Sequence, residues 1–145
     1  MKIYHHTQPA KAMLAFLGLS FCALLVAAIH NHFMAIPMVI VWVTAWLFRS
    51  LTIEISDKEL IWFFGPGFPR KRVALSDIAS AEVIRTTFWN GWGIHYTAQG
   101  WLYNVAGYGA VCITLRNGKR FCLGSDEPEV LAGELKRLHR FVEAD

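Results

Sequence analysis

The highest local concentration of positive charge in this chain is Arg70-Lys71-Arg72, which directly follows the loop Gly65-Pro66-Gly67-Phe68-Pro69. Cations that lie against an anionic membrane leaflet each contribute about 1 kcal/mol of binding free energy. The alternative is that the three residues are the solvated start of a strand. The sequence therefore makes Arg70, Lys71 and Arg72 the candidate lipid-binding residues and leaves these two interpretations open.

A second candidate surface comes from a dense group of aromatic residues: Phe88, Trp89, Trp92, Tyr96, Trp101, Tyr103 and Tyr108. Trp and Tyr favour membrane interfaces and protein contacts, because each combines an apolar ring with a polar group. We expect about half of these rings to fill the core. Phe88 and Trp89 precede the turn signal Asn90-Gly91 and lie outside any clear alternating strand. We expect Phe88, Trp89 and Trp92 to contact the bilayer or a partner protein.

The six histidines raise the question of a metal or redox centre. They occur as His5-His6 near the start, His30 and His32 between two apolar runs, and His95 and His139 far along the chain. Structural metal sites use closely spaced Cys or His pairs, so this distribution predicts no metal and no cofactor. The weaker alternative is a redox or transport subunit in which His30 and His32 act together with a partner.

Signatures of catalysis are missing from the sequence. The short motifs Gly91-Trp92-Gly93 and Gly107-Tyr108-Gly109 are turn glycines that lack the length and the lysine of a phosphate-binding loop. No Gly-x-Ser-x-Gly nucleophile motif occurs. The sequence therefore favours a non-enzymatic binding protein.

Two apolar runs near the start must position these groups relative to a membrane. Ala12 to Ile29 and Phe33 to Phe48 carry no charged residue, and only His30-Asn31-His32 separates them. As a helix the first run extends for roughly 27 Å, close to the hydrocarbon thickness of a bilayer. A cleaved signal peptide explains the first run but not the second. We therefore expect a transmembrane helical hairpin over residues 12–49, preceded by a short cytoplasmic arm over residues 1–11.

The charges predict the orientation of this hairpin. Lys2, Lys11 and Arg49 flank the two runs, whereas the tip has no Lys or Arg. The positive-inside rule then places both termini in the cytoplasm. All 11 acidic residues follow Arg49 and balance the other 11 of the 14 cations, so the net charge of +3 belongs to the membrane flanks. A neutral domain argues against nucleic-acid binding.

Residues 50–145 are expected to form one domain of short antiparallel strands, as a small barrel or sandwich closed by a C-terminal amphipathic helix. The alternating segments are 51–55, 60–64, 70–75, 78–85, 93–97, 101–105, 110–115 and 119–123. Asp126 and Glu129 can form a capping box for the helix. Leu131, Leu135 and Leu138 lie on one face of it, which is expected to pack on the sheet.

Two stretches of this domain resemble bacterial pleckstrin-homology-like domains of small membrane proteins. They are Gly91-Trp92-Gly93-Ile94 with Gly100-Trp101-Leu102-Tyr103-Asn104-Val105, and Leu115-Arg116-Asn117-Gly118-Lys119-Arg120 with Gly124-Ser125-Asp126-Glu127-Pro128. The resemblance covers roughly residues 51 to 140. It implies a binding or scaffolding module of the bacterial inner membrane, an accessory subunit or assembly factor of a larger complex. In eukaryotic relatives cations in an early loop bind lipid headgroups, which implies anionic-lipid sensing as the alternative function.

The apolar residues on either side of Asn117-Gly118 predict how the two strands of this hairpin are paired. A three-residue loop pairs Val111 with Leu123 and Ile113 with Phe121, which makes one face uniformly apolar. In this register Cys112 lies directly opposite Cys122 on the outer face, within the distance that a disulfide needs. We expect both thiols to be reduced in the cytoplasm.

Overall fold

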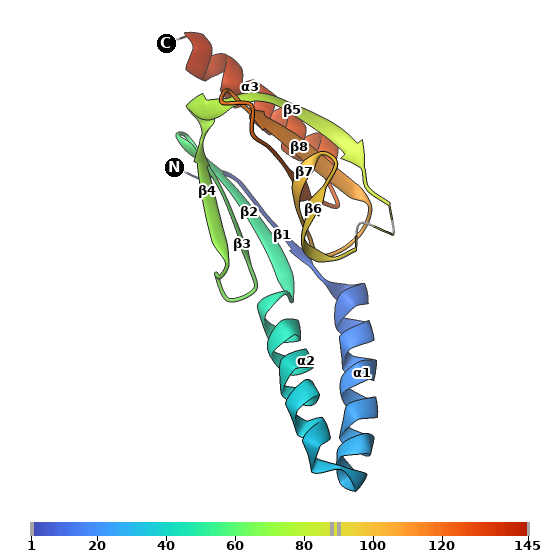
Figure 1. The fold of residues 1–145 in the computed structure, drawn as a ribbon. Coiled ribbons are helices and arrows are strands. Elements are labelled where there is room, and N and C mark those ends of the chain that lie inside the picture. Colours follow the sequence, from blue (N-terminus) through green and yellow to red (C-terminus); the bar gives the residue numbers. More distant parts are fainter. Residues whose placement is uncertain (1, 88, 90, 145) are drawn as a thin grey trace.

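The computed structural model describes residues 2–87, 89 and 91–144, and only the backbone of residues 141–144. Two helices form one end of the molecule, and two β-sheets with a third helix form the other (Figure 1). The start of β1 and the end of α3 both lie at the sheet end, away from the tip of the helical hairpin.

The helical end consists of α1 (Lys11–His30), a short 3-10 turn η1 (His32–Met34) and α2 (Ala35–Leu47). Pro37 lies in the first turn of α2, where its missing N–H leaves no carbonyl unsatisfied. Met13 is the one buried residue of α1, and α2 has none. Only α1 is both long and apolar enough to cross a membrane among the described helices, and α2 is a shorter apolar helix.

Sheet A contains four antiparallel strands in the order β1-β2-β3-β4. Their bounds are β1 (Lys2–Pro9), β2 (Ser50–Ser56), β3 (Glu59–Phe64) and β4 (Arg70–Ala74). Residues 2–9 of the expected short arm before the hairpin form a strand, because β1 pairs with β2 from Lys2↔Ser56 to Pro9↔Ser50. The sheet therefore uses chain segments from both sides of the helical hairpin.

Sheet B contains five strands in the order β5-β8-β9-β7-β6. A 3-10 turn η2 (Leu75–Asp77) leads into β5 (Ile78–Arg85), which is followed by β6 (Gly93–Thr97), β7 (Gly100–Asn104), β8 (Gly109–Leu115) and β9 (Arg120–Gly124). Strands β7 and β9 pair in parallel, which departs from the expected antiparallel arrangement. The described strands form two separate sheets and no closed barrel.

One hydrophobic core joins both sheets and α3 (Pro128–Ala144). It contains Ile53 and Trp62 of sheet A, Ile113 of sheet B and Leu135 of the helix, together with their neighbours. The expected face of α3, with Leu131, Leu135 and Leu138, is buried as predicted. Asp126 bonds to a histidine of β1, while Ser125 Oγ accepts a hydrogen bond from the Glu127 N–H at 3.1 Å.

The β8–β9 hairpin has the register predicted from its apolar pattern. Val111 pairs with Leu123, Ile113 with Phe121 and Cys112 with Cys122. The two cysteines lie on the face opposite the main core, but they are buried beside Leu102 and Ala110 in a smaller cluster rather than exposed. Their sulfur atoms are joined in a disulfide, with Cα atoms 4.0 Å apart.

The oxidation state of Cys112 and Cys122 in the cell gives a prediction about the compartment in which the domain lies. The cytoplasm keeps thiols reduced even where geometry permits a bond. If the domain lies in the cytoplasm, cells lysed directly into acid and then treated with a mass-tagging maleimide should therefore yield Cys112 and Cys122 as free thiols, in place of the disulfide that the structure contains. Cys22 is exposed on α1 and serves as the labelling reference. Recovery of the pair as a disulfide would contradict the cytoplasmic location of the domain.

Candidate functional site

The candidate site is built around the junction between the helices and the sheets. Pro9 pairs with Ser50, and the Ala10 N–H donates to the Arg49 carbonyl at 2.9 Å, so the two ends of the hairpin leave one strand pair side by side. The Phe48 ring meets the Phe64 ring at 5.0 Å, which connects the end of α2 to β3. The helices are therefore joined to sheet A without a flexible linker.

The β3–β4 loop lies directly against the end of α2. The Gly65 N–H donates to the Ser50 carbonyl at 2.9 Å. Gly65 has φ +35°, and a Cβ at this position would lie 2.4 Å from the Leu47 carbonyl oxygen, so only glycine fits. This contact holds the loop at the level of the helix end, where the Phe68 side chain is exposed.

A second loop region lies beside the start of α1. Thr87, Trp92 and Tyr108 line a cavity of about 290 Å³ together with Ala12 of that helix. Trp89 lies in the same segment and is 90% exposed. Trp92 and Tyr108 beside the start of α1, and Phe68 on the loop held at the end of α2, thus form an aromatic group at the helix-facing end of the sheets, which we name the helix-side rim.

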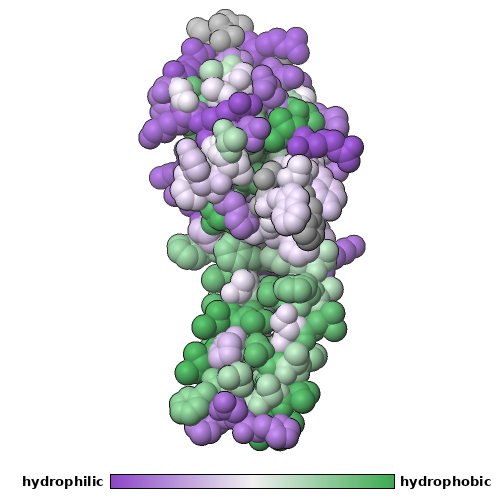
Figure 2. All heavy atoms as spheres, turned by 45° about the vertical axis from the view of Figure 1, so that its right-hand side comes forward, coloured by the Kyte–Doolittle hydropathy of each residue, from purple (hydrophilic) through white to green (hydrophobic). Residues whose placement is uncertain are grey.

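Hydropathy changes sharply at this level of the molecule. Figure 2 shows hydrophobic residues gathered over the helices, hydrophilic residues over the sheets, and a small hydrophilic group at the hairpin tip. Trp and Tyr favour the boundary between such regions when a bilayer covers the apolar part. The helix-side rim therefore has the aromatic composition that such a boundary favours.

The three aromatic residues proposed from the sequence have different environments. Trp89 is exposed as expected, whereas Trp92 is partly buried and packs against the core. Phe88 lies outside the described residues. Among the other rings of the group, Tyr103 packs on the core, and Tyr96, Trp101 and Tyr108 are exposed, so fewer than the expected half of the described rings are core.

The contrast between the two tryptophans gives a prediction. Trp89→Ser should change the free energy of unfolding by less than about 0.5 kcal/mol, because an exposed ring contributes little to packing. Trp92→Ser should cost more, about 1–3 kcal/mol, because it removes a ring packed on the core. Urea unfolding of both variants in the same detergent measures the difference. Equal destabilisation by the two substitutions would place Trp89 in the core.

The basic residues Arg70, Lys71 and Arg72 are all exposed on β4, the edge strand of sheet A. Because β4 starts at the loop held against α2, Arg70 is the nearest of the three to the helix end. The Arg70 guanidinium lies over the Phe63 ring at 4.8 Å, and Arg72 pairs with Ile61 in the ladder. Alternation puts Arg70 and Arg72 on one face and Lys71 on the other, so the cluster is a basic strip rather than a closed pocket.

Polar side chains of β1 form a network that the sequence analysis missed. The Lys2 ammonium donates to the Glu54 carboxylate at 2.7 Å, and the Tyr4 hydroxyl donates to Glu127 at 2.6 Å. His6 Nε2 lies 2.6 Å from Asp126 Oδ1. Burial, together with the adjacent Glu127, raises the pKa of Tyr4, so the phenol stays protonated as a donor at neutral pH. These bonds connect β1 to β2 and to the segment before α3.

The Glu54 contact gives a pH dependence of stability. The hydrogen bond from Lys2 lowers the pKa of Glu54, against an opposing effect of burial. A carboxyl whose pKa is lower in the folded state stabilises the fold above its unfolded pKa, about 4.3, and this contribution is lost as the pH falls through the folded pKa. The urea midpoint should therefore drop below about pH 4, and Lys2→Gln should reduce this drop. An unchanged acid profile in Lys2→Gln would show that the contact does not form in solution.

The histidines do not converge on one centre. His5 and His6 belong to β1, His30 and His32 are exposed at the hairpin tip, and His139 is on α3. His95 Nε2 is hydrogen-bonded to the Trp92 carbonyl at the start of β6. Within the described part of the chain, no three His, Cys, Asp or Glu side chains group as metal ligands.

Comparisons with known proteins return no match: no protein-family model, no curated protein and no solved structure is similar to this chain.

Proposed function

We propose that this chain is a non-enzymatic membrane-anchored binding module, in which a two-helix hairpin holds the sheet domain against the cytoplasmic face of the bacterial inner membrane. The observation that carries the proposal is the insertion of the hairpin between the paired strands β1 and β2. Because both helix ends leave one strand pair, the orientation of the domain relative to the bilayer is fixed. A fixed orientation suits a scaffold, an assembly factor or an accessory subunit of a larger membrane complex.

The exposure of the helices supports a membrane location. Almost none of the most apolar stretch of α1 is buried within the chain, and α2 has no buried residue. Exposed apolar surface of this extent requires lipid or protein to cover it. A cleaved signal sequence fits poorly, because β1 precedes α1 and is paired with β2. The described helix α2 is short for a complete span, and the adjoining η1 turn and flanking aromatic rings would extend it.

Co-purification of the full chain in mild detergent tests this function. The proposal predicts a partner protein that stays bound in fixed stoichiometry after gentle solubilisation. A second variant keeps the hairpin and replaces the sheet domain with an unrelated soluble domain. Loss of the partner from this variant would show that the sheet domain binds it. Recovery of the chain alone under all mild conditions, from cells expressing it at native level, would contradict the proposal.

A second candidate function is sensing of anionic lipid by Arg70, Lys71 and Arg72. It is favoured by the position of β4, which starts from the loop in contact with the Leu47 carbonyl. Cations at this level would lie within a Debye length of a charged leaflet. Within the described chain no acidic side chain forms an ion pair with any of the three.

Native mass spectrometry of the full chain, released from nanodiscs of mixed phosphatidylglycerol and phosphatidylethanolamine, tests this second function. Reversal of all three charges to glutamate should lower the retained phosphatidylglycerol severalfold. The matched control reverses Lys119 and Arg137, which are exposed on the β8–β9 turn and on α3. Equal retention in both variants would exclude Arg70, Lys71 and Arg72 as a lipid site.

A further inference from the structure

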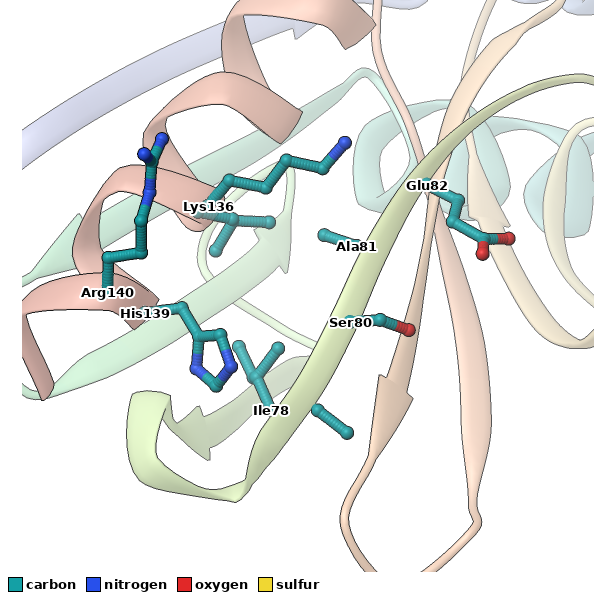
Figure 3. A pocket seen from close by; sticks show the side chains of 9 residues that line it. Ile78, Ser80, Ala81, Glu82, Lys136, His139 and Arg140 are labelled. Atoms are coloured by element: carbon teal, nitrogen blue, oxygen red, sulfur yellow. The ribbon is translucent and has the colours of Figure 1, made fainter. Parts of the chain in front are cut away.

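A groove separates the edge strand β5 from the helix α3 (Figure 3). It has a volume of about 440 Å³. Ile78 and Ala81 of β5 form one wall, and Lys136, His139 and Arg140 of α3 lie across from them. The groove is open to solvent and lies on the sheet domain, separate from the helix-side rim and from the basic strip on β4.

Among the four described edge strands, β5 is the one best suited to pair with an added strand. Side chains of β1 are hydrogen-bonded to other parts of the domain, including Gln8 to the Ala106 carbonyl at 2.9 Å, Tyr4 to Glu127 and His6 to Asp126. Strand β4 carries three consecutive cations, which discourage further strand pairing, and β6 has only 5 residues. Strand β5 has 8 residues, contains no proline and pairs with β8 alone among the described strands.

The register identifies which backbone groups of β5 face outward. Cys112 and Cys122 have Cα atoms 4.0 Å apart, the close spacing of a pair that does not exchange backbone hydrogen bonds. The N–H and C=O of Cys112 therefore point to β5, where Glu82 is its partner. The backbone groups of Ala81 and Val83 must then point to the open edge. The bond from the Thr86 N–H to the Tyr108 carbonyl agrees with this alternation.

The charged side chains around the groove indicate which class of ligand it would bind. Lys136 and Arg140 are exposed cations on its helix side. Figure 3 shows the Glu82 carboxylate on the far side of β5, pointing away from α3. An extended chain paired with β5 would thus lie beside the cations of α3, which favours aspartate or glutamate in the ligand.

We propose that β5 and α3 bind an extended acidic segment of a partner protein, which adds to sheet B as a further strand by pairing with Ala81 and Val83. Backbone hydrogen bonds then provide affinity, and Lys136 and Arg140 provide selectivity for acidic sequence. This inference rests on the proposed binding function and assigns a surface and a ligand class to it.

Fluorescence anisotropy with the full chain in zwitterionic nanodiscs tests the inference. The probes are two labelled heptapeptides of alternating residues, one with valine and glutamate and the other with valine and lysine. The glutamate peptide should bind at least about tenfold more tightly, and Lys136→Glu with Arg140→Glu should abolish that preference. Arg137→Glu on the same helix, which breaks only the surface pair with Glu134, is the matched control and should bind within about twofold of the parent.

Val83→Pro tests strand addition separately from charge. The substitution removes the backbone N–H of residue 83, which faces the open edge, and leaves the hydrogen bonds between β5 and β8 in place. The fold should therefore tolerate it, because edge strands tolerate proline. Binding of the glutamate peptide should fall at least about tenfold in a variant with an unchanged melting curve. If this variant does not fold, the charge-reversed helix variant decides the inference by itself.

Three results would overturn the inference: equal affinity for the two peptides, undiminished binding by folded Val83→Pro, or no binding of either peptide. Self-association that Val83→Pro abolishes would show that the edge pairs with a second copy instead of a peptide. A partner that co-purifies equally with the parent and both groove variants would refute this surface while leaving the proposed function intact. Absence of any partner would refute the function itself.

Discussion

Replacing Trp62 with alanine should destabilise the sheet domain by about 3–5 kcal/mol, the usual range for removal of a buried large aromatic side chain. Trp62 is buried on β3, stacks on Phe121 of β9 at 4.7 Å and meets the Tyr103 ring of β7 edge to face at 5.4 Å. It therefore packs sheet A directly against sheet B. The measurement is the free energy of unfolding in urea, followed by near-ultraviolet circular dichroism.

The matched control is Trp62→Phe. The Trp62 indole Nε1 is buried and has no hydrogen-bond partner in the described structure. Phenylalanine keeps a ring between the sheets and removes this unsatisfied donor, so the cost should be clearly smaller than that of alanine. If alanine and phenylalanine destabilise the domain equally, the two sheets do not pack through Trp62.

Replacing residues 3–9 with a glycine-serine segment of equal length should abolish cooperative folding of sheet A. The replacement removes the β-ladder to Ser50–Ser56 and the bonds from Tyr4 to Glu127 and from His6 to Asp126. A domain has only about 5–15 kcal/mol of total stability, so replacement of all but the first of the 8 residues of β1 is not tolerated. Limited proteolysis in membranes should cleave the variant within the sheet domain at protease concentrations that leave the parent intact.

Lys2 is retained in this variant so that the charge that directs membrane orientation is unchanged. Thr7→Ser is the mild control, because serine keeps the hydroxyl that bonds to Thr52 Oγ1 at 2.9 Å in the parent. A glycine-serine variant with parental protease resistance would mean that sheet A folds without the side chains of residues 3–9.

Most elements of the sheet domain could be predicted because their residues alternate. The segment Ile78–Arg85 matches its predicted bounds, and the β8–β9 register follows from the requirement for one apolar face. The apolar face of α3 could also be predicted, because its apolar residues recur at the spacing of a helix. Local periodicity determines these elements, so no knowledge of distant contacts was needed.

Strand β1 could not be predicted because its stability comes from distant partners. Its sequence, Lys-Ile-Tyr-His-His-Thr-Gln-Pro, has no apolar alternation, and Gln8 is its one buried residue. Pairing with β2 across the entire helical hairpin and bonds to Asp126 and Glu127 hold it in place. The parallel pairing of β7 with β9 is likewise a tertiary property that no local pattern reports.

The candidate site was predictable only in part. Charge and aromatic composition identified Arg70, Lys71, Arg72 and Trp89 as exposed, and all four are. The same composition did not distinguish Trp89 from Trp92, because burial depends on how the loop folds back on the core. The groove between β5 and α3 depends on strand order, so it was not visible in the sequence.

Accessibility of the hairpin tip tests the central claim that the two helices cross the membrane and hold the sheets on the cytoplasmic side. Asn31→Cys and Lys71→Cys, each in a background in which Cys22, Cys112 and Cys122 are replaced with serine or alanine, place one thiol at the tip and one on β4. A membrane-impermeant maleimide should label Asn31→Cys in cells with only the outer membrane permeabilised, and Lys71→Cys only after the inner membrane is broken. Labelling of both thiols, or of Lys71→Cys alone, before the inner membrane is broken would contradict the account.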